Sequence, residues 1–316
     1  MERTYAGRPV NFGMPTGDER HHTVRNRMLP KERLDLKALR IAVHGWWLGN
    51  PLVYKPGAAD LCAVARELAS AGAASGTLVL SDTRPDNGSA VAEPHVARHD
   101  IVQAVLILRS AIPRPLLGMA AALAVAEIAD GALDHFSAVQ WPWDVICYDD
   151  SSRQHQQRLC HVVVEEEADV AFVSLRLALG RIWAASATDG GATASLLARP
   201  DWREVFLAKV LHALDGRQRS LMTAEADSDA EKGKTALFYQ EWQRRLMVPA
   251  RVIVFCGDGT RHPGTVVGIA RDGALQMRRS DHEQDRIRLA DALATCGIGP
   301  LIAHEQIASA WDANWG

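Results

Sequence analysis

The chain has 316 residues, of which 47% are hydrophobic and 23% are charged. This composition is too apolar for a disordered chain, and the length is sufficient for two compact domains. The 35 Lys and Arg residues nearly balance the 38 Asp and Glu residues, and the net charge is -3. Because no strong overall field exists, we expect neither nucleic acid nor an anionic membrane surface as a partner.

Cysteine usage and the N-terminal composition bear on the cellular compartment. The five cysteines are scattered and form no C-x-x-C pair, which is typical of reduced thiols. Residues 1–40 contain no apolar segment of the kind found in signal peptides, and no later window reaches the roughly eighteen uncharged apolar residues that a membrane span needs. We therefore expect a cytoplasmic protein.

The first elements are expected after an N-terminal arm. Residues 1–38 show no sustained hydrophobic period and predict an arm. The apolar run at 39–43 predicts a strand. Trp46 and Trp47 follow it, between glycines, and need burial or a ligand.

The patterns beyond this segment predict a domain of the α+β class that spans 39–247. The expected elements are helices at 58–71, 113–130, 202–214 and 236–246, and strands at 76–80, 101–108, 138–148, 159–165 and 170–179. Between the first two strands lies a polar connection, 81–100, which is long enough to predict a functional loop.

The texture changes after Pro249. Short strands separated by Asp-Gly turns predict a small antiparallel barrel at 248–296. Residues 297–316 are expected to form a tail.

Three segments resemble the biotin and lipoate protein ligase superfamily. V-Q-W-P-W-D-V at 139–145 is similar to the family motif K-W-P-N-D. R-L-C-H-V-V-V-E at 158–165 is similar to the family's R/K-x-A-G-I-L-V-E strand, and D-G-A-L at 272–275 matches a turn of its C-terminal domain. The resemblance runs from about Leu61 to about Leu293, and it implies a mixed sheet with flanking helices followed by a small SH3-like β barrel.

The sequence departs from the family at the positions that carry the chemistry. The G-R-G-R-x-G-R loop of the family corresponds to 81–100, which offers only Arg84, Arg98 and a single glycine. The lysine of K-W-P-N-D is Gln140, and its asparagine is Trp143. The glycine of A-G-I-L is His161, whose side chain would fill space that the family keeps open. Loss of the lysine removes a charge-assisted contact of about 1.5–3 kcal/mol.

The resemblance implies a reaction if the chemistry is retained. The chain would use ATP and Mg²⁺ to convert a small carboxylic acid to an acyl-adenylate and pass the acyl group to an amine of an acceptor protein. Arg84 and Arg98 would meet the phosphate, Gln140 would bind the acyl carbonyl, and Asp144 would orient metal or nucleotide. Lys55 is the nearby lysine that we nominate as the replacement cation.

Other candidates have a functional and a structural interpretation. Trp141 and Trp143 would wall a ligand pocket or lie in the core, and period-2 alternation on one strand would place both on the same face. Arg158 would reach a carboxylate or phosphate, or be an exposed turn residue. Cys160 is expected to be a buried thiol, since it points away from His161 on the strand.

Two hypotheses of function remain open. In the first, the scaffold activates a carboxylic acid other than biotin with a different set of cations. In the second, the chain is catalytically inactive and binds a small molecule, a nucleotide or a protein partner. The lost lysine and glycines favour the second hypothesis for biotin itself. No metal site is predicted, because His95 and His99 lack further ligands at recognisable spacing, and a homodimer is compatible with the sequence.

Overall fold

A computed structural model of the chain describes residues 34–58, 60–82, 101–133, 136–148, 156–179, 199–223, 229–247, 251–255, 261–269, 275–279, 284–287 and 302–303. The chain divides into two units, 1–32 and 33–316, and the described residues belong to the second. Arg84, Arg98 and nearly all of the expected N-terminal arm lie outside the described residues.

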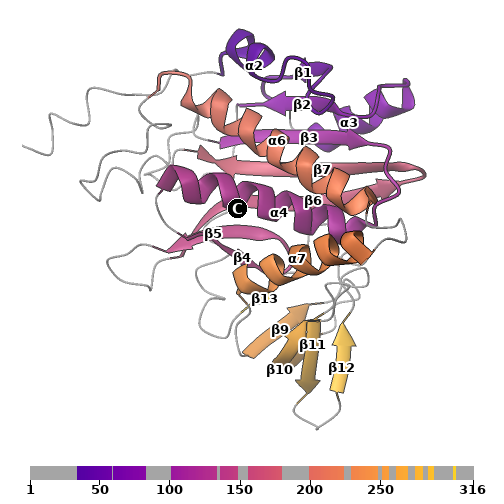
Figure 1. Cartoon of the computed structure of the whole chain (residues 1–316), viewed down its shortest axis with the longest axis vertical. Helices are drawn as coiled ribbons and strands as arrows, with labels where there is room; N and C mark the ends of the chain where they lie inside the picture. The colour runs from indigo at the N-terminus through magenta and orange to yellow at the C-terminus, as the bar shows by residue number, and fades with distance from the viewer. Residues whose placement is uncertain are drawn as a thin grey trace, which may run out of the picture. The chain divides into compact units, whose positions relative to one another are not determined.

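The main feature is a mixed sheet of eight strands in the order β1-β2-β3-β7-β6-β5-β4-β8 (Figure 1). The pairs β1–β2 and β4–β8 are parallel and the others antiparallel. The strands are β1 (Leu52–Tyr54), β2 (Thr77–Ser81), β3 (Ile101–Leu108), β4 (Ala138–Gln140), β5 (Asp144–Tyr148), β6 (Gln156–Glu167), β7 (Val170–Ala178) and β8 (Leu246–Met247). This mixed sheet confirms the predicted fold class.

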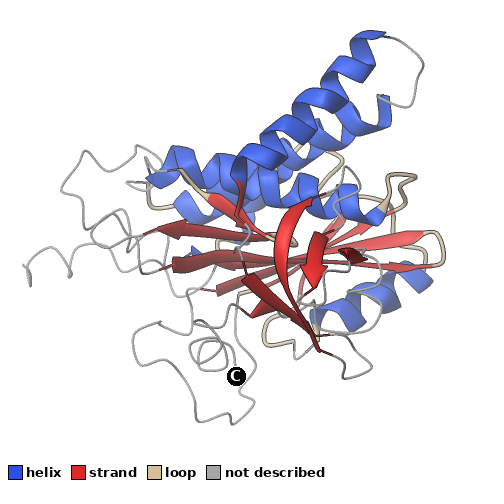
Figure 2. Cartoon of the chain, turned by 90° about the horizontal axis from the view of Figure 1, so that it is seen from below, coloured by secondary structure: helices blue, strands red, loops and turns tan. Residues whose placement is uncertain are grey.

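Helices cover both faces of this sheet (Figure 2). One face packs against α3 (Leu61–Ser70), and the other forms the larger core with α4, α6 and α7. The helices are α2 (Leu36–Ala42), α3, α4 (Arg114–Leu133), α6 (Trp202–Thr223) and α7 (Asp229–Arg245). Asp35 and Asp60 cap the first turns of α2 and α3 by accepting hydrogen bonds from backbone N–H groups.

Helix α4 is the centre of the larger core. Apart from Arg114, Glu127 and Asp130 its residues are apolar around the whole circumference, and they are buried without interruption from Leu117 to Ala126. Its length and composition would also suit a membrane span, with a mean hydropathy of 1.4, but 67% of that stretch is buried inside the fold. The helix lies across the sheet and packs on α6 (Figure 1), so its apolar composition is explained by burial between two layers.

The closest packing on α4 involves Trp143 and Gly118. Trp143 has no exposed surface, and a Cβ atom at Gly118 would overlap its indole ring. A glycine is therefore required here for close approach rather than for backbone freedom. The contact joins the turn between β4 and β5 to the central helix.

Two predicted strands differ from the structure. Residues 39–43 fall in and just after helix α2, because Asp35 caps a helix whose buried residues Leu39 and Val43 are spaced by four. The expected boundary of the arm at residue 38 lies inside this helix. The predicted strand 138–148 is instead two antiparallel strands joined by a turn at Trp141–Trp143 that contains a cis Trp141–Pro142 bond; Pro142 cannot donate a ladder hydrogen bond there.

A second, antiparallel sheet lies near the C-terminus of the sequence. It has five strands in the order β12-β11-β10-β9-β13. Their bounds are β9 (Arg251–Phe255), β10 (Arg261–Ile269), β11 (Leu275–Arg279), β12 (Gln284–Ile287) and β13 (Ile302–Ala303). Strand β13 falls in the segment expected to be a tail and pairs with β9, while closure into a barrel stays a prediction.

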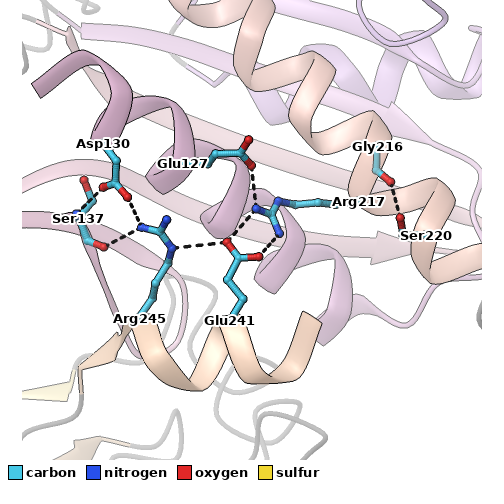
Figure 3. Close-up of polar contacts among 8 residues, drawn as sticks. All are labelled: Glu127, Asp130, Ser137, Gly216, Arg217, Ser220, Glu241 and Arg245. Carbon is cyan, nitrogen blue, oxygen red and sulfur yellow. Dashed lines mark hydrogen bonds and ion pairs between the residues drawn. The ribbon is translucent and has the colours of Figure 1, made fainter. Parts of the chain in front are cut away.

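Helix α7 is held in place by a chain of ion pairs (Figure 3). Arg217 of α6 bonds to Glu127 of α4 and to Glu241 of α7, each at 2.8 Å. Arg245, at the end of α7, pairs with Asp130 at 2.7 Å and with Glu241 at 3.5 Å. The network links three helices, and β8 follows α7 directly and pairs with β4. The ion-pair network therefore positions strand β8 at the edge of the sheet.

We predict that Gly118→Ala lowers the free energy of unfolding by about 1–3 kcal/mol, because the new methyl group meets a rigid buried ring. Gly131→Ala is the matched control on the same helix, since nothing lies within 4 Å of its Cβ position. The control should raise stability by about 0.5–1 kcal/mol through helix propensity. Urea unfolding measures both, and unchanged stability of G118A would contradict the described packing.

We predict that Arg245→Met lowers the free energy of unfolding by about 2–4 kcal/mol, since the partly buried carboxylate of Asp130 loses its ion pair with a buried guanidinium. Amide hydrogen exchange should rise first in α7 and β8. Arg199→Ala is the control, because its pair with Asp201 is exposed and should contribute nothing measurable. Equal exchange in α7 of both variants would show that the network does not anchor the helix.

Candidate functional site

Six polar side chains lie in register across the face of the large sheet that carries α3. From β2 to β4, this polar row consists of Ser81, Gln103, Arg176, His161, Asp144 and Gln140. The strand registers place Ser81 opposite Gln103, Gln103 opposite Arg176 and Arg176 opposite His161. Gln140 lies opposite Asp144, and Asp144 contacts His161 directly.

The polar row exists because successive residues on a strand point to opposite faces. The neighbours of these residues, such as Leu80, Ala104 and Leu175, are buried in the core with α4. Two residues further along the strands, Val79, Val105 and Ser174 occupy the same face as the row. Val79 and Val105 are buried against α3, and Ser174 contacts Cys62 of α3 at 3.4 Å. Helix α3 thus covers one part of the face, and the row lies next to it.

The tightest contacts in the row surround Asp144. Its Oδ1 lies 2.6 Å from Nδ1 of His161, and its Oδ2 lies 3.1 Å from Nε of Arg158. The carboxylate also accepts a hydrogen bond from the backbone N–H of Val162. The side chain of Asp144 is 10% exposed and that of His161 is 31% exposed, so the imidazole is the more accessible member.

The environment of Asp144 favours its ionised form. Burial alone would raise its pKa, but the charges of His161 and Arg158 and the hydrogen bonds from His161 and Val162 outweigh burial. The pKa of Asp144 is therefore below its ordinary value. At neutral pH the side chain is a carboxylate that contacts the Arg158 guanidinium and the His161 imidazole.

These contacts leave Asp144 poorly suited to bind Mg²⁺. Both of its oxygens already contact side-chain nitrogens, of Arg158 and His161, whereas Mg²⁺ requires free carboxylate oxygens at close range. Within the described ranges, no group of three or more His, Cys, Asp or Glu residues could hold a metal ion. The expected role of Asp144 toward a metal therefore finds no support in the geometry.

The structure brings four of the predicted site residues into one cluster. Gln140, Asp144, Arg158 and His161 lie on adjacent strands at the β4–β5–β6 edge of the sheet. Gln140 is 3% exposed, and its position opposite Asp144 places its amide at the end of the row. Arg158 is a largely buried strand residue with a carboxylate partner rather than an exposed turn residue.

The two tryptophans of the motif belong to the core. Trp141 is 2% exposed and Trp143 is fully buried, and both are members of the cluster around α4. The inference that they share one face of a strand is wrong, since they lie in the turn between β4 and β5. This burial supports the structural interpretation of both residues.

Lys55 lies far from Gln140. Its backbone N–H donates to the carbonyl of Leu80 at 2.8 Å, so it continues β1 beside Ser81 at the opposite end of the row. With strands about 4.8 Å apart, six strand spacings separate it from Gln140 by roughly 29 Å. The structure does not bring this lysine to the position that the family lysine would occupy.

The sequence reasoning overlooked Arg176. It is the only charged residue in the otherwise apolar strand β7, and the register places it between Gln103 and His161. A single arginine within an apolar central strand was a usable signal, because a charge is costly there unless it has a partner or a ligand. With Arg158, it is one of two guanidinium groups that the described strands place next to the Asp144–His161 pair.

Cys160 lies on the opposite face from His161, as the alternation predicts. Its side chain is fully buried in the α4 core. Burial raises the pKa of its thiol well above the ordinary value, and the Asp144 charge adds to the effect. The thiol is a structural group and forms no dyad with the adjacent imidazole.

Comparison with solved structures identifies the fold. The biotin protein ligase of Aquifex aeolicus matches with a TM-score of 0.52 and 14% identity, over 75% of this chain and 94% of that chain. The same ligase in complex with biotin and ATP gives a TM-score of 0.52 and 14% identity, over 77% of this chain and 97% of that chain. A variant of that ligase in complex with biotin matches with a TM-score of 0.53 and 15% identity, over 77% of this chain and 97% of that chain. No family model and no curated protein matches the sequence.

The likeness to these structures defines the fold class of the chain. The eight-stranded sheet with its flanking helices is a biotin/lipoate protein ligase-like catalytic fold, in agreement with the resemblance of the motifs. At this level of identity the likeness concerns the fold.

We predict that Asp144→Asn lowers the free energy of unfolding by about 3 kcal/mol at pH 7, because Arg158 and His161 lose their counter-charge. The pKa of Asp144 is lower in the folded than in the unfolded chain. Its carboxylate therefore stabilises the fold above the unfolded-state pKa of about 4, and this contribution is lost as the pH falls through the lowered pKa.

Thermal unfolding of both proteins against pH measures this effect. The difference in Tm between wild type and D144N should be large at neutral pH and should shrink as the pH falls below about 4. A difference in Tm that does not change in that range would show that Asp144 gains nothing from its partners.

Proposed function

We propose that the chain is a ligase that activates a small carboxylic acid with ATP as an acyl-adenylate and transfers the acyl group to an amine. The polar row is the proposed binding site. The observation that carries the proposal is that, on one face of a ligase-like sheet, Arg158 and His161 contact the carboxylate of Asp144 and Arg176 lies opposite His161.

The charge balance of the row suits an anionic ligand. Among the described residues, the row and its neighbour Arg158 contain two guanidinium groups and the carboxylate of Asp144, and guanidinium donors form charge-assisted hydrogen bonds with a carboxylate or a phosphate. Arginine suits both anions, because its planar donors match two oxygens at once. Arg176 lies near the middle of the row, where it would contact the acid and the nucleotide of an adenylate together.

Other residues have supporting roles in the proposal. Gln140 would donate its amide N–H to the acyl carbonyl at the end of the row. Arg84 and Arg98 would meet the triphosphate from the loop after β2, and Lys55 would approach the same loop rather than the acyl group. The neighbour bound to biotin and ATP supports a two-part ligand of this kind.

A second candidate is a binding protein without ligase activity. It is favoured by Gln140, which is buried and neutral at the lysine position of the motif. Among the residues that the structure describes, the row contains no lysine. A ligand would then bind to the row and remain chemically unchanged.

The test is trapping of an activated acid. The protein is incubated with Mg·ATP, hydroxylamine and one of biotin, lipoic acid, octanoic acid or acetic acid, and hydroxamate and pyrophosphate are measured. We expect both products with at least one acid, and Arg176→Gln should weaken apparent acid or ATP affinity about 10–100-fold through loss of a charge-assisted contact.

Arg40→Gln is the control, because this arginine lies exposed on α2 and away from the row. It should behave as the wild type. Saturable thermal stabilisation by ATP or an acid without either product would favour the binding protein. If the protein forms neither product and is not stabilised by any of these probes, both candidates are overturned.

A further inference from the structure

We propose that His161 is the general base of the acyl-transfer step and that its Nε2 atom takes the proton from the attacking amine. This inference rests on the proposed ligase function and adds the residue that prepares the acceptor. The reaction needs such a group, since an amine that attacks a carbonyl carbon must lose a proton.

The hydrogen bond to Asp144 determines which nitrogen of His161 is basic. Nδ1 lies 2.6 Å from a carboxylate oxygen, and a carboxylate only accepts hydrogen bonds. The proton of the neutral imidazole therefore lies on Nδ1, and the lone pair lies on Nε2. Arg158 and the Val162 backbone N–H hold the carboxylate from other directions, so the orientation of the ring is fixed.

The second nitrogen is available for chemistry. His161 is about three times as exposed as Asp144, at 31% against 10%. Within the described part of the chain, no hydrogen bond engages Nε2. The arrangement matches the general pattern of a base whose far nitrogen is held by a buried acid while its near nitrogen faces the substrate.

The position in the row places this base at the proposed reaction centre. The charged groups that face His161 are Asp144 from β5, Arg158 from its own strand and Arg176 from β7. Arg176 would hold an anionic ligand directly beside the ring.

In the proposed step, the lone pair of the amine nitrogen forms a bond to the acyl carbon of the adenylate. The bond between that carbon and the phosphate oxygen breaks, and AMP leaves with its electron pair. The proton of the amine passes to Nε2 of His161, and Asp144 stabilises the resulting imidazolium.

A comparison of two nucleophiles tests the inference. Hydroxylamine is largely unprotonated at neutral pH and attacks activated acyl groups readily, so it reports adenylate formation without a catalytic base. The amine of Nα-acetyl-lysine amide has a pKa of about 10.4 and needs the base. Both are supplied with Mg·ATP and the acid that gives most hydroxamate with the wild type.

We expect His161→Gln to reduce transfer to the lysine amide about 10²–10⁴-fold while hydroxamate formation stays within a few-fold of the wild type. His44→Gln, an exposed histidine on the segment after α2, should change neither rate. The wild type alone gives a second readout, since transfer to the lysine amide, divided by the fraction of unprotonated amine at each pH, should still fall toward acidic pH.

The outcomes separate the two proposals. An unchanged ratio of the two rates in H161Q would overturn the role of His161 as the base, whether both rates fall equally or neither falls. Equal loss of both products would show that His161 acts before transfer. A wild-type rate of transfer per unprotonated lysine amide that does not depend on pH would also overturn the role as the base, even if H161Q failed to fold. If the wild type forms no hydroxamate with any of the acids, the proposed ligase function itself is overturned.

Discussion

The register between β3, β7 and β6 is the constraint on which both the core and the candidate site depend. Because side chains alternate, one register buries Leu175 and Leu177 under α4 and also aligns Gln103, Arg176 and His161 on the other face. A slip of one residue would exchange the two sets. It would place a guanidinium in the apolar core, where an unpaired charge costs several kcal/mol. The hydrophobic effect therefore positions the polar groups.

The edge of the sheet that bears Gln140 is fixed by different means. The indole of Trp143 against Gly118 joins the β4–β5 turn to the central helix, and the ion pairs of Arg217 and Arg245 join α7, and with it β8, to the same helix. Helix α4 is thus the common support for the turn and for the outermost strand. The Asp144 cluster lies between these two anchors, so its geometry depends on packing from the opposite face.

Much of the fold could be predicted from sequence because the signals were local. The runs that form β3 and α4 are long and apolar, and their predicted bounds agree within a few residues. Helix α2 was mistaken for a strand because Ile41 and Val43 are β-branched, although Asp35 provides a cap. Asp144, Arg158 and His161 were candidates individually, but their contact depends on the β5–β6 register, which includes an irregularity after Val145. Arg176 lies in none of the family-like motifs, and only the pairing of β7 with β3 and β6 places it beside Gln103 and His161.

The span of the polar row limits what can occupy it. From Ser81 to Gln140 it crosses six neighbouring strands, or five spacings of about 4.8 Å, roughly 24 Å in all. A single short metabolite is much smaller than this strip and would touch only a fraction of it. Two molecules laid end to end would meet near the midpoint of the row, between Arg176 and His161. A ligand that joins the two would contact the whole row, whereas each component alone would contact only half of it.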